Sequence, residues 1–283
     1  MDAADDIRRA RPQLGTFVEI AVGGAPAPAI EAAVEAAFAA VAEVHRLMSP
    51  DEPASDVSRI NRGAERSAVV VHPWTLRVLA FAAALHRSSG GVFDVTAGSI
   101  YPPAGAAVAL LPGNRVHLRN PCRIDLGGIA KGFAVDRAIA VLRRHAMPRG
   151  LVNAGGDLAA FGAGPHAVHL RDPRDPRQTM LQVAIRDAAV ASSGGRFDPA
   201  VSSAPESPDT IDPRTGQPAG TVLGATVRAP SCMVADALAK VVMIAGEAAS
   251  ELLRDHGASA LFVSRSGELH LWGEWQDAVR LAA

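Results

Sequence analysis

A short apolar run, two consecutive glycines and an amphipathic segment follow one another in the stretch RIDLGGIAKGFAVDRA. We expect a buried strand over residues 123–126, which carries Asp125, and a helix over residues 129–146. Glycine has no Cβ, so Gly127 and Gly128 allow the backbone to turn sharply and approach another group closely. The chain must therefore place the end of a strand directly against the start of a helix.

The start of this helix suits an anion. Backbone N–H groups at a helix N-terminus favour phosphate, and Lys131 in the first turn can reach the same group. The alternative is a tight strand-to-helix connection in which the glycines only relieve crowding. The residues alone leave both readings open, since the segment is neither a Walker loop nor a G-x-G-x-x-G fingerprint.

Strands and helices mix along the rest of the chain without a regular βαβ rhythm, which predicts an α+β fold with an antiparallel sheet. Alternating patterns predict strands at residues 14–22 and 222–229, and strand pairs within 150–161, 165–190 and 260–271. Apolar spacing predicts helices at residues 29–48, 73–89, 233–246 and 248–256. Residues 49–66, 99–122 and 194–220 are rich in turn-forming residues and are interpreted as loops, with one short strand near Val116.

Composition excludes several classes of protein. A chain of 283 residues that is 48% hydrophobic can bury one large core or two small ones. A net charge of −1 and 4% aromatic residues argue against a nucleic-acid partner. Two cysteines without CxxC spacing argue against structural zinc. No leader, lipid-attachment cysteine or long apolar run is visible, so we expect a cytoplasmic protein without membrane insertion.

Two further polar turns are candidates for a site. In LVNAGGDLAAFG, Asn153 and Asp157 flank a glycine pair, which is either a simple hairpin turn or the floor of a polar pocket. In TIDPRTGQPAG, Arg214 can pair with a phosphate or with Asp212. For each turn taken alone, the structural reading is favoured.

The segment MVADALAKVVMIAG predicts an apolar helix interrupted by Asp236 and Lys240. Their i,i+4 spacing places both side chains on one face of the helix. A surface ion pair is the simple interpretation, but the neighbouring residues are nearly all apolar. Burying such a pair costs several kcal/mol per ion unless it is repaid, so a functional site is a reason to keep it.

The order of these segments carries more information than any one of them. LGTFVEI, SDVSRIN, SSGGVFDVTAGSI, IDLGGIAKGFAVD, LVNAGGDLAAFG, AVASSGG, IDPRTGQP and ADALAK follow one another between about residue 10 and residue 246. This arrangement resembles the ApbE family of FAD:protein FMN transferases. The resemblance implies an α+β fold with a T-fold-like core of antiparallel sheet, packed helices and an FAD cleft. It also implies that residues 1–283 form a single domain, which could be divided into two lobes.

The implied activity is a phosphoryl transfer. Such enzymes bind FAD, break its pyrophosphate, release AMP and link FMN through a phosphodiester to a Thr or Ser of an acceptor protein, with magnesium assisting. Carried over by position, the implied FAD contacts are Leu14, Asp56, Val57, Ser58, Val92, Phe93, Asp94, Asp125, Lys131 and Ile211, with the turn that contains Asn153, Gly155 and Gly156 beside the flavin or its diphosphate. The implied magnesium ligands are the backbone oxygen of Gly128 and the carboxylate of Asp236, which also has a catalytic role.

Two positions depart from the family pattern. Lys240 stands where many members have a threonine that ligates magnesium, and a protonated ammonium cannot be a ligand. We expect Lys240 to pair with Asp236 and to replace or weaken magnesium. Asp209 stands where many members have a histidine, and it becomes the candidate base that deprotonates the acceptor hydroxyl. Two alternatives therefore stay open: an FAD-binding protein without transferase activity, and an FAD pyrophosphatase.

Overall fold

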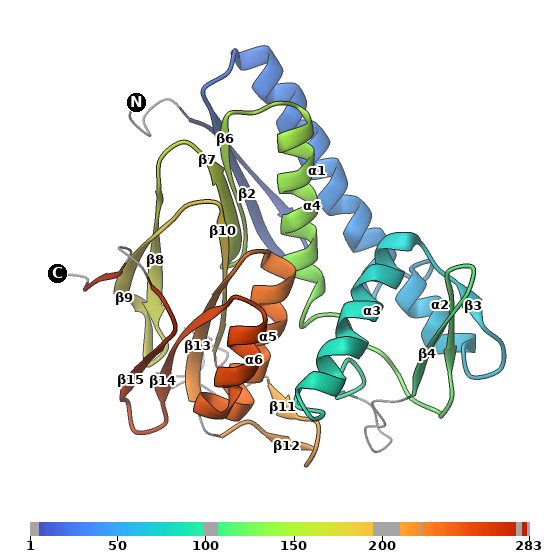
Figure 1. Ribbon diagram of the computed structural model, residues 1–283. Coiled ribbons are helices and arrows are strands. Elements are labelled where there is room, and N and C mark those ends of the chain that lie inside the picture. The colour runs from blue at the N-terminus through green and yellow to red at the C-terminus, as the bar shows by residue number, and fades with distance from the viewer. Residues whose placement is uncertain (1–5, 99–106, 195–209, 221, 276–278, 282–283) are drawn as a thin grey trace.

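An eight-stranded antiparallel sheet forms the centre of the computed structural model, which describes residues 6–98, 107–194, 210–220, 222–275 and 279–281 (Figure 1). The strand order is β1-β2-β6-β7-β10-β13-β14-β15. The strands, in chain order, are β1 (Ile7–Gln13), β2 (Thr16–Gly23), β6 (Arg149–Ala154), β7 (Asp157–Gly162), β10 (Ala188–Gly194), β13 (Val222–Ala229), β14 (Ser259–Ser264) and β15 (Leu269–Trp272).

Helices cover one face of this sheet. They are α1 (Ala27–Met48), α4 (Ala130–Arg144) and α5 (Cys232–Ala245), followed by a 3-10 turn (Gly246–Ala249) and α6 (Ser250–Asp255). Side chains alternate between the faces of a strand, so Val18 and Ile20 of β2 join the core under the helices, whereas Ala21 joins a second core. The main core of the protein thus lies between the sheet and its helices.

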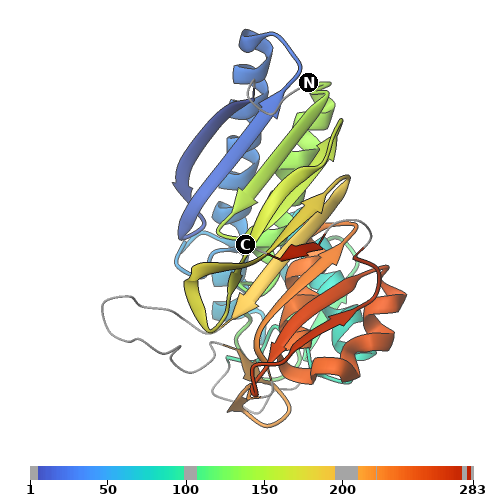
Figure 2. The same ribbon diagram turned by 90° about the vertical axis from the view of Figure 1, so that its left-hand side faces the viewer.

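The opposite face carries a small three-stranded sheet of β8 (His166–Asp172), β9 (Asp175–Ile185) and β16 (Val279–Leu281). Figure 2 shows β8 and β9 in front of the large sheet, with the helices behind it. The second core fills the space between the two sheets, where residues such as Leu170 and Leu181 pack with Leu151 and Val190. The described chain is therefore built in three layers.

A smaller unit stands beside these layers (Figure 1). It contains α2 (Asp56–Gly63), α3 (Pro73–Ser88) and a sheet of β3 (Val69–Val70), β5 (Arg115–Leu118) and β4 (Val108–Leu111). The hairpin of β11 (Ile211–Asp212) and β12 (Gln217–Pro218) lies below α5 in the same view. The assignment of the whole chain to one domain stays a prediction.

The predicted α+β class with antiparallel pairing is confirmed, and the predicted helices match α1, α3, α4 and α5 to within a few residues. The strand predicted over residues 123–126 is wrong. Its backbone is held by the side chain of Asn61, which accepts from Ile124 N at 2.8 Å, and by Val95 O, which accepts from Asp125 N at 2.7 Å. These partners are not strands, so the segment is a tethered connection.

Several elements fall where loops were predicted or where nothing was assigned. Helix α2 lies within residues 49–66, and its polar sequence is stabilised by Ser55, whose side chain caps it by accepting from Ser58 N. Edge strand β1 is rich in arginine. Its Arg8, Arg9 and Arg11 pair with glutamates on β2 and α1, which holds this charged strand at the edge of the sheet. The other additions are β3, β4, β11, β12 and β16.

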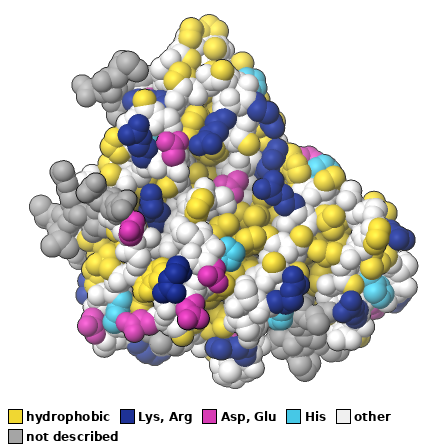
Figure 3. Space-filling view, in the orientation of Figure 1, with side chains coloured by type: hydrophobic (Ala, Val, Ile, Leu, Met, Phe, Trp, Pro, Cys, Tyr) yellow, Lys and Arg dark blue, Asp and Glu magenta, His cyan; other side chains and the backbone are white. Residues whose placement is uncertain are grey.

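Among the described helices, none combines the length and the hydropathy needed to cross a lipid bilayer. On the face seen in Figure 3, basic and acidic side chains are interspersed over both the three-layered part and the smaller unit.

Candidate functional site at the start of helix α4

The first turn of α4 packs against the first turn of α5 with no space between the backbones. A Cβ built on Gly132 would lie 2.2 Å from the carbonyl oxygen of Cys232, so only glycine fits at this position. The Gly132 N–H donates to Oδ2 of Asp236 at 3.0 Å. The Gly-Gly turn and the glycine that follows it in α4 therefore bring the helix start directly onto a carboxylate of α5.

Asp236 belongs to a cluster of four charged side chains. Its Oδ1 accepts from Lys240 Nζ at 2.5 Å, one turn along α5. Lys131, in the first turn of α4, donates to Oδ2 of Asp157, the first residue of β7. We call Lys131, Asp157, Asp236 and Lys240 the lysine–aspartate cluster. Three elements that are distant in sequence build it, and it holds two positive and two negative groups.

Burial and charge act in opposite directions within the cluster. Burial, together with the nearby Asp236, raises the pKa of Asp157 to about 6 against the opposing pull of the two lysines. Burial would also raise the pKa of Asp236, but Lys240 and Lys131 outweigh it and hold that pKa below its ordinary value. Burial would lower the pKa of Lys131, yet Asp236 and Asp157 raise it. The site thus keeps Asp236 ionised and Lys131 charged at neutral pH.

Asp157 was expected only as a flank of the glycine turn, and the FAD and magnesium contacts implied by the family resemblance did not include it. Its side chain is 1% exposed, and its Oδ1 has no hydrogen-bond partner among the described residues. A buried carboxylate oxygen without a partner is costly, which is typical of a binding or catalytic site. The sequence signal for it is its place directly after a glycine turn, at the start of an otherwise apolar strand.

A second carboxylate makes the reciprocal contact between the two helices. Asp136 of α4 accepts from the backbone N–H groups of Cys232 at 2.7 Å and Met233 at 2.9 Å, at the start of α5. Burial raises its pKa, partly offset by these two hydrogen bonds. Each helix therefore supplies an aspartate to the N-terminus of the other, where the helix dipole favours negative charge.

The segment around residue 93 borders the cluster. A Cβ built on Gly128 would lie 3.9 Å from Phe93 Cε2 and 3.7 Å from Lys240 Cγ, which places all three together. Val92 and Phe93 are buried. Asp94 is held by Thr96, whose N–H and hydroxyl both donate to its Oδ1, and its Oδ2 lies 3.6 Å from His86 Nδ1.

The comparisons with known proteins agree on one family. The model of the ApbE family matches residues 14–262 of the chain. The chain belongs to the ApbE family. It is 29% identical to the FAD:protein FMN transferase of Treponema pallidum (strain Nichols), over 90% of this chain and 83% of that protein. It is 28% identical to the protein of the same name from Vibrio cholerae, over 72% of this chain and 71% of that one.

Solved ApbE structures have the same fold. The ApbE protein from Thermotoga maritima superposes with a TM-score of 0.84 at 26% identity, covering 95% of this chain and 97% of that one. The flavin transferase ApbE from Vibrio cholerae superposes with a TM-score of 0.79 at 22% identity, covering 96% of this chain and 98% of the other. The ApbE resemblance inferred from the eight sequence blocks is therefore confirmed.

The ApbE pattern placed FAD contacts in six regions of the chain. The structure brings three of them, residues 92–94, residues 125–131 and the Asn153 turn, to the cluster or its border. Gly128, Phe93 and Lys240 lie together as described above, and Lys131 belongs to the cluster that Lys240 also joins. Asp125 is exposed, and its Oδ1 accepts from Gly127 N at 2.7 Å, so it shapes the glycine turn. A Cβ on Gly91 would lie 3.8 Å from Arg214 Cγ, which brings the β11–β12 hairpin beside the residue-93 segment. Ile211 of that hairpin is 38% exposed.

The turn that contains Asn153 lies at the end of the large sheet. Asn153 Oδ1 accepts from Gly156 N at 2.9 Å and closes the turn. Leu14 lies in the neighbouring β1–β2 turn, and a Cβ on Gly155 would lie 2.7 Å from Thr16 Oγ1. Because Asp157 directly follows this turn, the turn adjoins the cluster.

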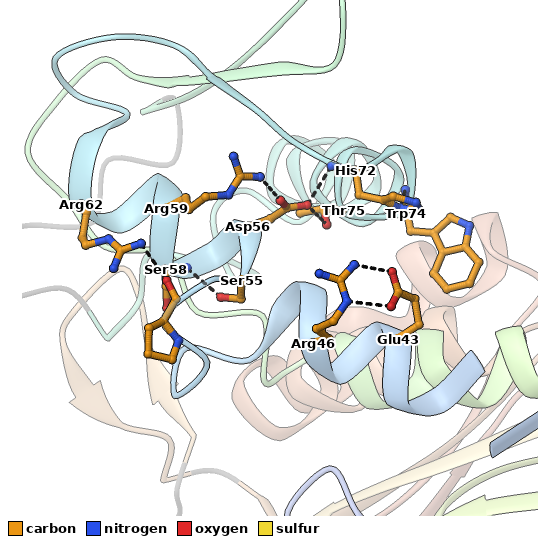
Figure 4. A network of polar contacts seen from close by, with 11 residues as sticks. Glu43, Arg46, Ser55, Asp56, Ser58, Arg59, Arg62, His72, Trp74 and Thr75 are labelled. Carbon is orange, nitrogen blue, oxygen red and sulfur yellow. Dashed lines mark hydrogen bonds and ion pairs between the residues drawn. The ribbon is translucent and has the colours of Figure 1, made fainter. Parts of the chain in front are cut away.

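Asp56 is buried in a network of its own in the smaller unit (Figure 4). Its Oδ2 accepts from His72 N at 2.8 Å and Thr75 Oγ1 at 2.6 Å, and its Oδ1 pairs with Arg59. Ser58 donates to Pro50 O, and Val57 is fully buried. Oδ2 of Asp56 thus joins α2 to the start of α3, while Oδ1 is paired within α2.

A groove of about 1050 Å³ lies between the large sheet and the β8–β9 pair. Of the predicted FAD contacts, Asn153, Gly155 and Gly156 line it. The lysine–aspartate cluster lies on the helix-covered side of the same sheet. The predicted FAD contacts therefore lie on both faces of the sheet, near the turn that contains Asn153. The FAD cleft stays a prediction. Asp209 lies outside the described residues.

The residues at the predicted magnesium position do not fit that ion. Magnesium requires near-octahedral oxygen ligands, but both oxygens of Asp236 already accept hydrogen bonds from Lys240 and Gly132. Lys240 also packs against Gly128, the predicted backbone ligand. Within the described residues, no group of three or more His, Cys, Asp and Glu side chains is arranged to hold a metal ion. The expected pairing of Lys240 with Asp236 is present.

Proposed function

We propose that this chain transfers the FMN part of FAD to a Thr or Ser hydroxyl of an acceptor protein and releases AMP. The ApbE family model spans most of the chain, and the relatives that match it are named FAD:protein FMN transferases. The observation that carries the proposal is the lysine–aspartate cluster beside the glycine turn. It holds one ammonium group in the first turn of α4 and a second beside the glycine turn that precedes this helix, an arrangement that suits a diphosphate.

In the proposed reaction, the acceptor hydroxyl oxygen attacks the phosphorus on the FMN side of the pyrophosphate. A new P–O bond forms, the bond to the bridging oxygen breaks, and AMP leaves with that oxygen. The hydroxyl proton passes to a base, for which Asp209 is the candidate. Lys131 and Lys240 offset the negative charge of the diphosphate while the bond order changes.

The FAD contacts implied by the family pattern are part of this proposal. They group around the cluster, the residue-93 segment, the Asn153 turn and the start of α2. Because both oxygens of Asp56 are engaged within the protein, we assign its side chain to positioning α2, and any contact with FAD to the backbone of residues 56–58. No step of the proposed reaction depends on magnesium.

Incubation of the protein with FAD and a Thr-containing acceptor peptide tests the proposal. Chromatography of the nucleotides and mass spectrometry of the peptide separate the outcomes. AMP together with peptide that carries FMN supports transfer. AMP with free FMN would identify a pyrophosphatase, and bound FAD without turnover would identify a flavin-binding protein.

A matched pair of variants connects this activity to the cluster. Lys131→Met removes one ammonium from the first turn of α4 and should abolish AMP release. Arg143→Met removes an equal charge from the last turn of the same helix, where Arg143 pairs with Asp187 at the surface, and should leave AMP release unchanged. Equal losses in both variants would show that the effect comes from the helix or its net charge and not from the cluster.

A further inference from the structure

The chain has only two lysines, and both lie in the lysine–aspartate cluster. Lys131 and Lys240 are the only lysines among 28 basic residues, so arginine occupies every other basic position. Arginine is a planar fork with fixed donor directions, whereas the lysine ammonium is a compact point charge with three rotatable donors. A chain that otherwise uses arginine thus places a compact monovalent cation at two positions, next to two buried carboxylates.

The cluster has a defined inside and outside. The side chains of Asp236 and Asp157 are 0% and 1% exposed, whereas those of Lys240 and Lys131 are 22% and 32% exposed. The negative groups therefore form the floor and the positive groups form the accessible surface. A ligand that approaches from solvent meets the lysine side chains and not the carboxylates, which favours an anion over a metal cation.

We propose that Lys131 and Lys240 together replace a divalent cation, so that the diphosphate of FAD binds to this chain without metal. Two ammonium groups carry the charge of one divalent ion, and each has three donors. Each lysine uses a donor on its aspartate and keeps others for phosphate oxygens. The inference rests on the proposed function, because it names the groups that neutralise the diphosphate in that reaction.

The geometry argues against a divalent cation that binds in addition to the two lysines. A cation at Asp236 would have to displace Lys240 Nζ, and the displaced ammonium would then lie beside a divalent ion. Within the cluster, the carboxylate oxygen without a hydrogen-bond partner is Asp157 Oδ1, and the side chain that carries it is 1% exposed. Metal binding would therefore require the cluster to be taken apart.

Calorimetry on the wild-type protein gives the first test. The dissociation constant of FAD is measured in EDTA and in millimolar magnesium, and magnesium is titrated into the protein with and without FAD. We expect the two FAD constants to agree within about twofold, since a lost charge-assisted contact would change them by about tenfold or more. Magnesium binding in the micromolar range, or FAD binding that requires magnesium, would overturn the inference.

The rarity of lysine gives a second, independent readout. Protein labelled with ¹³C and ¹⁵N in lysine alone reports just two ammonium groups in its NMR spectrum. FAD should shift both signals, whereas magnesium without FAD should leave both in place. A shift of the Lys240 signal on adding magnesium would show that the ion displaces it from Asp236.

A variant reverses the expected metal dependence. Lys240→Met leaves Asp236 without its cation, so FAD affinity in EDTA should fall by about tenfold. Magnesium should then restore much of that loss, because a carboxylate oxygen has become free. Arg143→Met should show neither effect. Should magnesium fail to improve FAD binding by folded Lys240→Met, the cluster does not stand in for a divalent ion.

These outcomes separate the two proposals. If FAD binds only with magnesium, the metal replacement is wrong while the transferase proposal stands. If FAD does not bind under any condition, the proposed function is wrong. If FAD binds without metal but no acceptor is modified, the charge replacement holds for a flavin-binding protein.

Discussion

Helices α4 and α5 exchange two aspartates that differ in their partners. Asp136 accepts two backbone N–H groups at the start of α5. Asp236 accepts one N–H group at the start of α4 and pairs with Lys240. The first arrangement is complete as a helix cap. At Asp236, the ion pair with Lys240 adds charge that capping a helix does not require. This additional charge distinguishes a functional site from a structural contact.

The pKa directions of the two aspartates express the same difference. Burial raises the pKa of Asp136 because its backbone donors only partly offset the loss of water. At Asp236 the two lysines overcome an even stronger burial effect, and the pKa falls. Aspartates in the second turn of two neighbouring helices thus have pKa values shifted in opposite directions.

The largest expected effect on stability comes from removing the carboxylate of Asp236. Asp236→Ala leaves Lys240 without its partner and Gly132 N–H without its acceptor, so the free energy of unfolding should fall by about 3–5 kcal/mol. Urea denaturation measures it. Glu31→Ala, which removes an exposed pair with Arg9, is the control and should cost at most about 1 kcal/mol. Similar losses in both variants would contradict a special role for the cluster.

Forcing the two helices apart at Gly132 should have a smaller effect on stability. The Cβ of Gly132→Ala meets the backbone of Cys232, which cannot move without shifting α5, so unfolding should become easier by about 1–3 kcal/mol. Gly63→Ala in α2 meets nothing within 4 Å and is the matched control. A Gly132→Ala protein as stable as the wild type would mean that the helices are not in contact there.

Removing the ordinary cap should cost less again. Asp136→Ala frees two N–H groups at the start of α5, and the typical cost of a lost cap is about 1–2 kcal/mol. Asp136→Asn keeps one acceptor and should fall between. FAD affinity should change little in either variant, whereas in Asp236→Ala it should fall sharply. If FAD binding responds equally to both aspartates, the comparison drawn between them fails.

The smallest effect is a difference in pH dependence. The folded-state pKa of Asp236 is below the ordinary value of about 4, so its stabilisation is lost as the pH falls through that folded-state value. Asp136 has a raised folded-state pKa, so its contribution decreases as the pH rises from about 4 through that pKa. Urea denaturation of Asp236→Asn and Asp136→Asn between pH 3 and 7 should show opposite slopes relative to wild type. Parallel slopes would refute the assignment.

Much of the architecture could be predicted from local sequence. The helical spacing of apolar residues identified α1, α3, α4 and α5, and the i,i+4 rule placed Asp236 and Lys240 on one face. The prediction failed where distant residues decide the conformation. Asn61 holds Ile124 in an extended segment that is not a strand, and no local pattern announces a partner so far away in the chain.

The sequence by itself determined the ApbE membership, the glycine turn before α4 and the pairing of Lys240 with Asp236, because these depend on the order and spacing of nearby residues. Only the tertiary structure decided that Asp157 joins Lys131, that both aspartates are buried and that the two lysines form the accessible side. The physical reason is that desolvation depends on what packs around a charge. That packing is set by the contact of α4, α5 and β7, which lie far apart along the chain.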